Sequence, residues 1–161
     1  MPLLLRRSAL LVILAAVLGT VYAAAPFTPS KPTDDKPRYF DGKVVPLADL
    51  VEKSGTKLDA DAAPHWLALV ADDGKVYPLV KDDASRLFFR DKALLNRPMR
   101  ILGKLVPNST LLRVMSVRSL IKGQPHDVYY WCDVCAIRRD EKMICECCNG
   151  KMDLVEVPAK E

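Results

Sequence analysis

The sequence predicts a mainly β protein with one helix, built as a small five-stranded barrel and a C-terminal cysteine-rich hairpin. Between residues 38 and 124, short β-branched stretches alternate with turn residues, and one segment has apolar residues at helical spacing. All five cysteines lie within residues 131–154. The 161 residues suffice for one domain and a small appendage, and the 50% hydrophobic, 27% charged composition is that of a globular protein.

The N-terminal segment, residues 1–24, has the pattern of a secretory signal peptide. Arg6 and Arg7 precede an apolar run over residues 9–18, and small residues follow Gly19. The alternative is an uncleaved membrane anchor, but the run is short for about 30 Å of hydrocarbon. We therefore expect an exported protein, periplasmic or extracellular, that contacts a membrane only if this segment is retained. Residues 25–37, which hold four prolines, are predicted to be an extended linker.

The first half of the predicted barrel, residues 38–124, contains a strand and a hairpin. The stretch YFDGKVVPL predicts a strand interrupted by a turn at Asp41-Gly42, and a short helix and a loop follow from Leu47. Two apolar runs then flank Asp72-Asp73-Gly74, which predicts a hairpin with a positive φ at Gly74. Because Pro78 cannot donate to a strand ladder, the second strand of this hairpin is expected at a sheet edge.

The second half contains the helix and two more strands. Asp82 or Asp83 is a candidate N-cap for a helix that runs to about Leu95, with Asn96 suited to a left-handed ending and Pro98 preventing continuation. MRILGKLV and TLLRVMSVRSLI then predict two strands joined by a turn at residues 107–109.

The aromatic and charged residues constrain the partners. Trp66, Phe88 and Phe89 are predicted to pack in the core, and His65 to lie at the surface or a strand end. Without the two leader arginines, 22 basic residues face 20 acidic ones, from 24 and 20 in the whole chain. With so little net charge and no basic stripe, the sequence does not favour nucleic-acid binding.

The cysteines form two Cys-x-x-Cys pairs, Cys132 with Cys135 and Cys145 with Cys148, separated by nine residues. Two such turns on a hairpin are the usual way to build a tetrahedral four-sulfur metal site. Cys147 is then the spare thiol inside the second turn, or it replaces Cys148 as a ligand. Gly150 is expected to let the second turn tighten.

Other uses of these cysteines remain open or fail on spacing. Two disulfides fit an oxidising compartment but leave one thiol unpaired. WCDVC matches the thioredoxin motif, yet only 26 residues follow Cys135, too few for that fold. A c-type haem needs His where Ala136 and Asn149 stand. Iron and copper(I) also accept thiolates, so zinc is the first choice and these two metals are alternatives.

Two resemblances to known families rest on these motifs. The stretch DGKVYPLVKDDASRLFFRDKALLNRPMRILGKL is similar to part of an OB-fold, which implies a five-stranded barrel over residues 38–124. Residues 126–158 resemble the rubredoxin-like zinc ribbons and the small heavy-metal-binding ribbons, which implies a four-cysteine zinc module. The matching positions outside the four cysteines are an aromatic residue before the first turn, a charged loop, a glycine and a Met-x-Leu-Val strand, here Tyr130, RRDEK, Gly150, Met152, Leu154 and Val155. Glu146 and Asn149 depart from the usual rubredoxin iron turn, which favours zinc.

Three functional hypotheses follow. The first is an exported, non-enzymatic binding or scaffolding protein held together by zinc, because no catalytic constellation is visible and a four-thiolate site has no open position. The second is soft-metal handling or thiol redox chemistry by the same cysteines, with Met143 and Met152 either assisting copper(I) or simply packing. The third rests on HDVYY, since His126 and Tyr130 resemble the His-x-x-x-Tyr of an exported OB-type haem chaperone. The alternative interpretation of that stretch is a linker whose tyrosines pack the two parts of the protein together. The sequence identifies no partner beyond an unknown protein.

Overall fold

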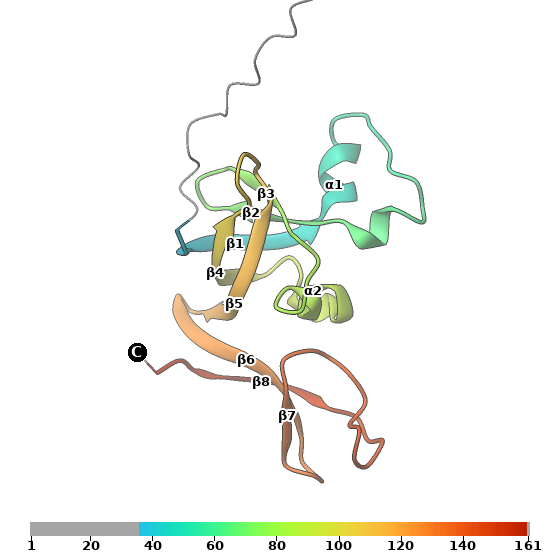
Figure 1. Ribbon diagram of the computed structural model, residues 1–161, viewed down its shortest axis with the longest axis vertical. Coiled ribbons are helices and arrows are strands. Elements are labelled where there is room, and N and C mark those ends of the chain that lie inside the picture. Colours follow the sequence, from blue (N-terminus) through green and yellow to red (C-terminus); the bar gives the residue numbers. More distant parts are fainter. Residues whose placement is uncertain (1–35, 161) are drawn as a thin grey trace, which may run out of the picture.

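The computed structural model describes residues 36–160, so the predicted signal peptide and most of the predicted linker lie outside the described residues. Within this range the chain forms eight strands and four short helical segments (Figure 1). In chain order they are β1 Arg38–Pro46, α1 Leu47–Glu52, η1 Ala63–His65, β2 Leu67–Ala71, β3 Val76–Pro78, α2 Arg86–Arg90, η2 Lys92–Leu94, β4 Pro98–Leu105, β5 Leu112–Ile121, β6 Gln124–Cys132, β7 Ile137–Arg139 and β8 Asp153–Pro158.

The strands make one antiparallel sheet in the order β3-β2-β1-β4-β5-β6-β7, and β8 pairs separately with β6. This confirms the mainly β class and the predicted succession of strand, hairpin, helix and two strands. The predicted closed, OB-like five-stranded barrel over residues 38–124 is not formed, because the sheet stays open. Beyond β3, a single parallel bridge joins Leu79 to Leu112. Closure stops there because β3 is only three residues long and ends at Pro78, which has no N–H to donate. The far half of β5 pairs with β6 instead.

The predicted turn signals are confirmed where glycine or asparagine takes a positive φ. Gly74 turns the β2–β3 hairpin at φ 80°, and Asn96 ends the helical region at φ 61°. Asn108 has φ 57° in the connection between β4 and β5. Pro78 lies in β3, at one end of the strand order, as expected for an edge position. These turns were predictable because their chemistry is local.

The turn predicted at Asp41-Gly42 is wrong, since β1 runs through it without interruption. Gly42 pairs with Ala71 of β2 on one side and with Met99 of β4 on the other. A Cβ at Gly42 would meet the Val70 carbonyl oxygen and lie 2.7 Å from the Ala71 Cα. The glycine is therefore needed for close strand approach and not for a turn.

The long helix predicted from Asp82 or Asp83 to Leu95 is also wrong, because the helical region is broken at Asp91. The α-helix α2 ends at Arg90, Asp91 is extended at φ −128° and ψ 106°, and η2 begins at the next residue. The Asp91 side chain accepts a hydrogen bond from the Ala93 amide and so caps η2. A periodic apolar pattern alone does not reveal such a break.

The hydrophobic core lies between this helical region and the inner faces of β1, β2, β4 and β5. Phe88 is buried as predicted, and Phe89 packs against the core from a partly buried position. Trp66 was predicted to lie in the core but is 48% exposed, because it caps η1 just before β2 begins. His65 is exposed, as expected.

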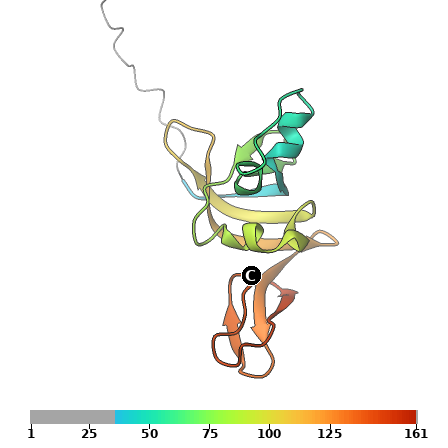
Figure 2. The ribbon, with the colours of Figure 1, turned by 90° about the vertical axis from the view of Figure 1, so that its right-hand side faces the viewer.

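Strand β6 is shared by the two ends of the molecule. Residues 124–127 pair with β5, residues 130–132 pair with β7, and β8 pairs with residues 126–131 (Figures 1 and 2). The HDVYY stretch is therefore part of strand β6, and not the linker that the alternative interpretation predicted. We use "main region" for residues 38–121 and "cysteine hairpin" for residues 129–158. In both views the cysteine hairpin projects from one end of the main region.

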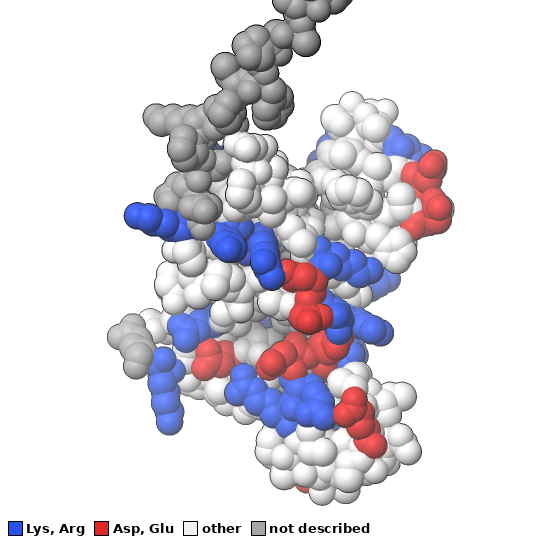
Figure 3. Space-filling view, viewed as in Figure 1, with Lys and Arg blue, Asp and Glu red and all other residues white. Residues whose placement is uncertain are grey.

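Charged side chains of both signs are interleaved across the middle of the face in Figure 3, and no large area of one sign is visible there. Many charged side chains of the described residues form ion pairs, among them Arg86 with Glu141 at 3.1 Å and Arg97 with Glu156 at 2.5 Å. No helix within residues 36–160 is both long enough and apolar enough to span a membrane.

Candidate metal centre

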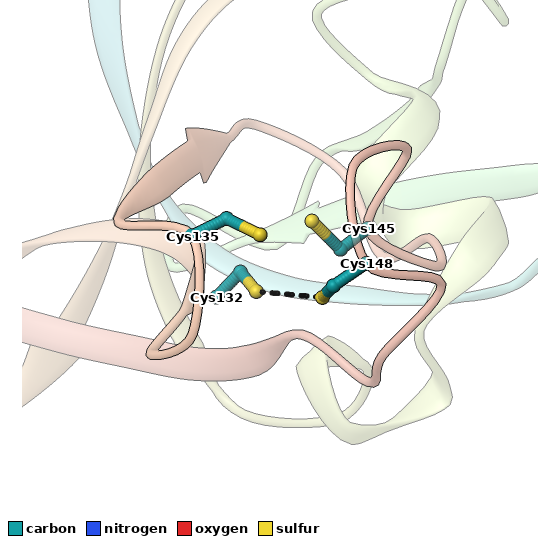
Figure 4. A group of neighbouring side chains, drawn as sticks. All are labelled: Cys132, Cys135, Cys145 and Cys148. Atoms are coloured by element: carbon teal, nitrogen blue, oxygen red, sulfur yellow. Dashed lines mark hydrogen bonds between the residues drawn. The ribbon is translucent and has the colours of Figure 1, made fainter.

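The two Cys-x-x-Cys turns bring four sulfur atoms together at the far end of the cysteine hairpin (Figure 4). Cys132 is the last residue of β6, and Cys135 lies in the turn before β7. Cys145 and Cys148 lie in the second turn, which is closed by an isolated bridge between Ile144 and Lys151. The backbone beside each turn is therefore paired with a neighbouring segment, and each turn points its two sulfur atoms toward the opposite turn.

The sulfur positions fit one tetrahedral ion. The four Sγ atoms all lie within 4.8 Å of one another, and those of Cys132 and Cys148 are 3.5 Å apart. Bonds of about 2.3 Å in a tetrahedron place sulfurs about 3.8 Å from each other. All five cysteines are free thiols, and a disulfide would need an S–S distance of about 2.05 Å. These four cysteines are close enough to hold a metal ion among them.

Both turns end in the same unusual way. The residue after each Cys-x-x-Cys pair is left-handed, Ala136 at φ 52° and Asn149 at φ 54°. Gly150, which we expected to tighten the second turn, has no positive φ. Its N–H instead donates to the Cys148 sulfur at 3.4 Å, and a Cβ there would lie 3.1 Å from that sulfur. Gly150 thus lets the backbone approach a sulfur, while Ala136 and Asn149 make the turns.

Backbone amides inside each turn point at the first cysteine of that turn and favour its thiolate. Hydrogen bonds from the Cys148 and Cys147 amides lower the pKa of Cys145 to about 6. Around Cys132, the Cys135 amide also lowers the thiol pKa. Burial and hydrogen bonds to the Cys145 and Cys148 sulfurs outweigh it, so the net pKa is raised. This is the environment in which a thiolate, or a cation bound to thiolates, is stabilised.

The pKa of Cys135 is raised far above the usual thiol range. The first cause is hydrogen bonding with the Cys147 thiol, and burial follows. Cys147 itself is exposed and does not belong to the set of four mutually close sulfurs. The assignment of Cys132, Cys135, Cys145 and Cys148 as the group, with Cys147 as the spare thiol, agrees with this geometry.

The hydrophobic support of this group is small. Only Tyr130, Cys132, Cys145 and Met152 form its buried cluster. Met143 packs against that cluster, so both methionines near the cysteines serve as packing residues here.

The buried carboxylate of Asp91 is one of the groups that join the cysteine hairpin to the main region. The Tyr130 hydroxyl donates to Asp91 Oδ2 at 2.9 Å, and Lys142 Nζ donates to Asp91 Oδ1 at 3.1 Å. Burial raises the pKa of Asp91, but hydrogen bonds from Ala93, Lys142 and Tyr130 outweigh burial and lower it overall. Asp91 therefore remains a carboxylate at neutral pH. It accepts hydrogen bonds from Ala93 of the main region and from Tyr130 and Lys142 of the cysteine hairpin. Sequence analysis missed it, because no local signal connects positions 91, 130 and 142.

His126 and Tyr130 do not form an open ligand pair. Tyr130 is 1% exposed, and burial, followed by its hydrogen bond to Asp91, raises its pKa. His126 lies four residues earlier along the same extended strand, with Nδ1 2.9 Å from the Gln124 carbonyl oxygen. A buried phenol engaged with a carboxylate is poorly suited to bind haem iron, so the site gives the haem hypothesis no support.

Comparison of the chain with protein-family models, with curated proteins and with solved structures found no match. The interpretation of the four-cysteine group as a metal centre therefore rests on its geometry.

Proposed function

We propose that this chain is an exported, non-enzymatic zinc-binding protein in which Cys132, Cys135, Cys145 and Cys148 hold one zinc ion. The ion serves as the structural centre of a binding or scaffolding module. The observation that carries the proposal is the convergence of four thiols from two turns within 4.8 Å.

The donor set supports a structural role. Four sulfurs complete the coordination of a tetrahedral Zn²⁺, so no position is left for water or substrate. When bound, zinc supplies a fixed cross-link between the two turns. The amides that face Cys132 and Cys145 stabilise negative charge on sulfur and orient both side chains. Iron and copper(I) also bind thiolates, so they are alternatives that metal analysis distinguishes.

The small core of the cysteine hairpin supports the same role. Its buried cluster has four residues, and two of them are cysteines of the metal group. Such a small apolar cluster cannot offset the conformational entropy of ordering some 30 residues. A metal ion bound only by the folded hairpin adds its binding free energy to folding.

Soft-metal handling or thiol redox chemistry is the second candidate, and one observation favours it. Cys148 is only partly buried, and the exposed Cys147 lies beside it and interacts with Cys135. The thiolate of Cys145, with a pKa of about 6, is present at neutral pH. A site of this kind exchanges its metal with added thiols or copper(I), whereas a structural zinc site does not.

Export remains a proposal that rests on the sequence pattern of residues 1–24. In an oxidising compartment, zinc also protects the four thiols from pairing. The proposed partner is a protein, which we leave unidentified.

The test is metal content and thiol count on protein purified from its own compartment. We expect about one zinc per chain and five thiols after unfolding without reductant. Cys132→Ser or Cys145→Ser should abolish zinc retention, whereas Cys147→Ser, the matched control, should retain it. A metal-free protein with two disulfides would refute the structural zinc site. Copper(I) replacing zinc under native conditions would favour the second candidate.

A further inference from the structure

Far from the cysteines, two arginines lie side by side on the outward face of the sheet. Arg100 of β4 is the direct cross-strand partner of Arg118 of β5. Like charges directly opposite each other on a sheet are destabilising, so this pairing calls for a physical reason.

Each arginine is drawn to the outer side of the pair by its own carboxylate. Arg100 donates through Nε and Nη2 to the two oxygens of Asp41, at 2.8 and 2.6 Å. Arg118 donates through Nε to Asp127 at 2.9 Å. The four residues form one row across β1, β4, β5 and β6, with the acids at its ends. The carboxylates fix the two guanidinium groups and splay them apart, and no carboxylate of the row lies between them.

A surface hollow of about 360 Å³ opens at this row. It is lined by Tyr39, Arg100, Arg118, Pro125 and Lys160, a set with three positive charges and no acidic residue. Lys160 is brought there by the Ala159 amide, which donates to the Pro125 carbonyl oxygen at 3.0 Å. Tyr39 is 58% exposed, and its ring centroid lies 5.9 Å from the guanidinium carbon of Arg100.

We propose that this hollow binds a phosphate-type oxyanion, carried by a small phosphorylated molecule or by a lipid headgroup. Planar guanidinium groups match phosphate oxygens in bidentate fashion, and a negatively charged oxyanion between Arg100 and Arg118 offsets their repulsion. Lys160 adds a third donor, and the Tyr39 ring provides a wall for an organic group. The site is independent of the metal centre, so either proposal can fail without the other.

The test is calorimetric titration of the purified full chain with inorganic phosphate in a phosphate-free buffer. A parallel assay measures sedimentation with phosphatidylglycerol vesicles and with neutral phosphatidylcholine vesicles. We expect saturable binding to phosphate, to the anionic vesicles or to both, weakened by added salt. Arg118→Gln should weaken binding roughly tenfold or more, because a charge-assisted hydrogen bond is lost. Lys160→Gln removes one of the three positive charges that line the hollow and should weaken binding severalfold.

Arg113→Gln is the matched control. Arg113 lies on β5, as Arg118 does, and pairs with Asp82 at 3.4 Å, outside the lining of this hollow. Its substitution by Gln removes the same positive charge as Arg118→Gln. This variant should bind like the parent chain. Binding to free phosphate alone identifies a small phosphorylated ligand, and Arg118-dependent binding to anionic vesicles alone identifies a lipid headgroup. The proposal is overturned by absence of saturable binding in both assays, or by equal losses in Arg118→Gln and Arg113→Gln.

Discussion

The main region and the cysteine hairpin hold their strands together by different physics. In the main region and its junction with β6, sixteen buried residues form one hydrophobic cluster. In the cysteine hairpin the buried cluster has four members, and the centre is a group of thiols. Burial of apolar side chains stabilises the first at about 25 cal/mol per Å². The second buries less such area, and under the proposal above a metal ion bound by the four thiols adds its binding free energy to folding.

The two regions are nevertheless physically connected to each other. They share β6, Leu154 packs against both clusters, and Asp91 accepts from Tyr130 and Lys142 across the junction. The ion pairs of Arg86 with Glu141 and of Arg97 with Glu156 also cross the junction, so a change in one region can reach the other through these contacts. The predictions below separate the regions in order of expected effect.

Metal removal should give the largest effect and confine it to the cysteine hairpin. Structural zinc binding is worth about 10–16 kcal/mol in zinc-finger peptides. We expect a strong chelator to abolish amide protection at β7 and the ends of β6 and β8, while β1, β2 and β4 stay protected. Hydrogen exchange read by mass spectrometry checks this. Equal loss of protection in both regions would contradict the division.

A cavity made in the main region should lower the free energy of unfolding and leave metal binding by the cysteine hairpin unchanged. Ile101 is fully buried, so Ile101→Ala should lower the free energy of unfolding by about 2–5 kcal/mol. Zinc stoichiometry should stay unchanged under conditions where the variant is folded. Urea unfolding and metal analysis measure the two quantities. Met115→Ala, at a position 49% exposed, serves as the control with a small effect.

Metal affinity should fall steeply with acid. At pH 7 the thiol of Cys145, with a pKa of about 6, is ionised, while Cys132 and Cys135, whose pKa values are raised, are protonated. Metal binding then releases at least two protons, so affinity should change by about two decades or more per pH unit near neutrality. The lowered Cys145 pKa favours the folded, metal-free hairpin above the usual thiol pKa, and this contribution is lost as pH falls through about 6. Competition titrations at several pH values provide the measurement, and a pH-independent affinity would exclude thiolate ligation.

The Asp91 junction should have a smaller effect. Asp91→Asn removes the charge that accepts from Tyr130 and Lys142, and we expect a loss of about 2 kcal/mol. Because the Asp91 pKa is lowered, its contribution is present above the unfolded value near 3.9 and disappears as pH falls through the folded value. A double-mutant cycle with Tyr130→Phe should show coupling between the two residues. Strict additivity would mean that the hydrogen bond contributes nothing.

The smallest effect concerns the first cysteine turn. Ala136 has φ 52°, a conformation that costs a residue with a Cβ about 1–2 kcal/mol. Ala136→Gly should therefore strengthen zinc retention by about 1 kcal/mol. Asn149→Gly, at φ 54°, is the control and should change less, because asparagine tolerates this conformation. Chelator competition on the two variants measures the difference, and equal gains would indicate another cause.

How much of this molecule was predictable depends on the range of the signal. The two Cys-x-x-Cys turns, the hairpin at Gly74 and the helix end at Asn96 were predictable because each is built by neighbouring residues. The exposed position of Trp66 and the close approach at Gly42 were not, because both depend on which strands lie alongside. The left-handed residues Ala136 and Asn149 were also missed, since attention to Gly150 followed the usual preference for glycine.

The sequence by itself determined the mainly β class, the succession of the first five strands along the chain and the four cysteines that converge, because periodicity, turn chemistry and ligand spacing are local properties. Only the tertiary structure decided that the sheet stays open, that β6 runs from the main region into the cysteine hairpin, and that Asp91 joins them. It alone placed Arg100 opposite Arg118 with Lys160 beside them. The reason is physical: strand register and long-range packing set these contacts, and several of them join residues far apart in the chain, such as Asp91 and Lys142.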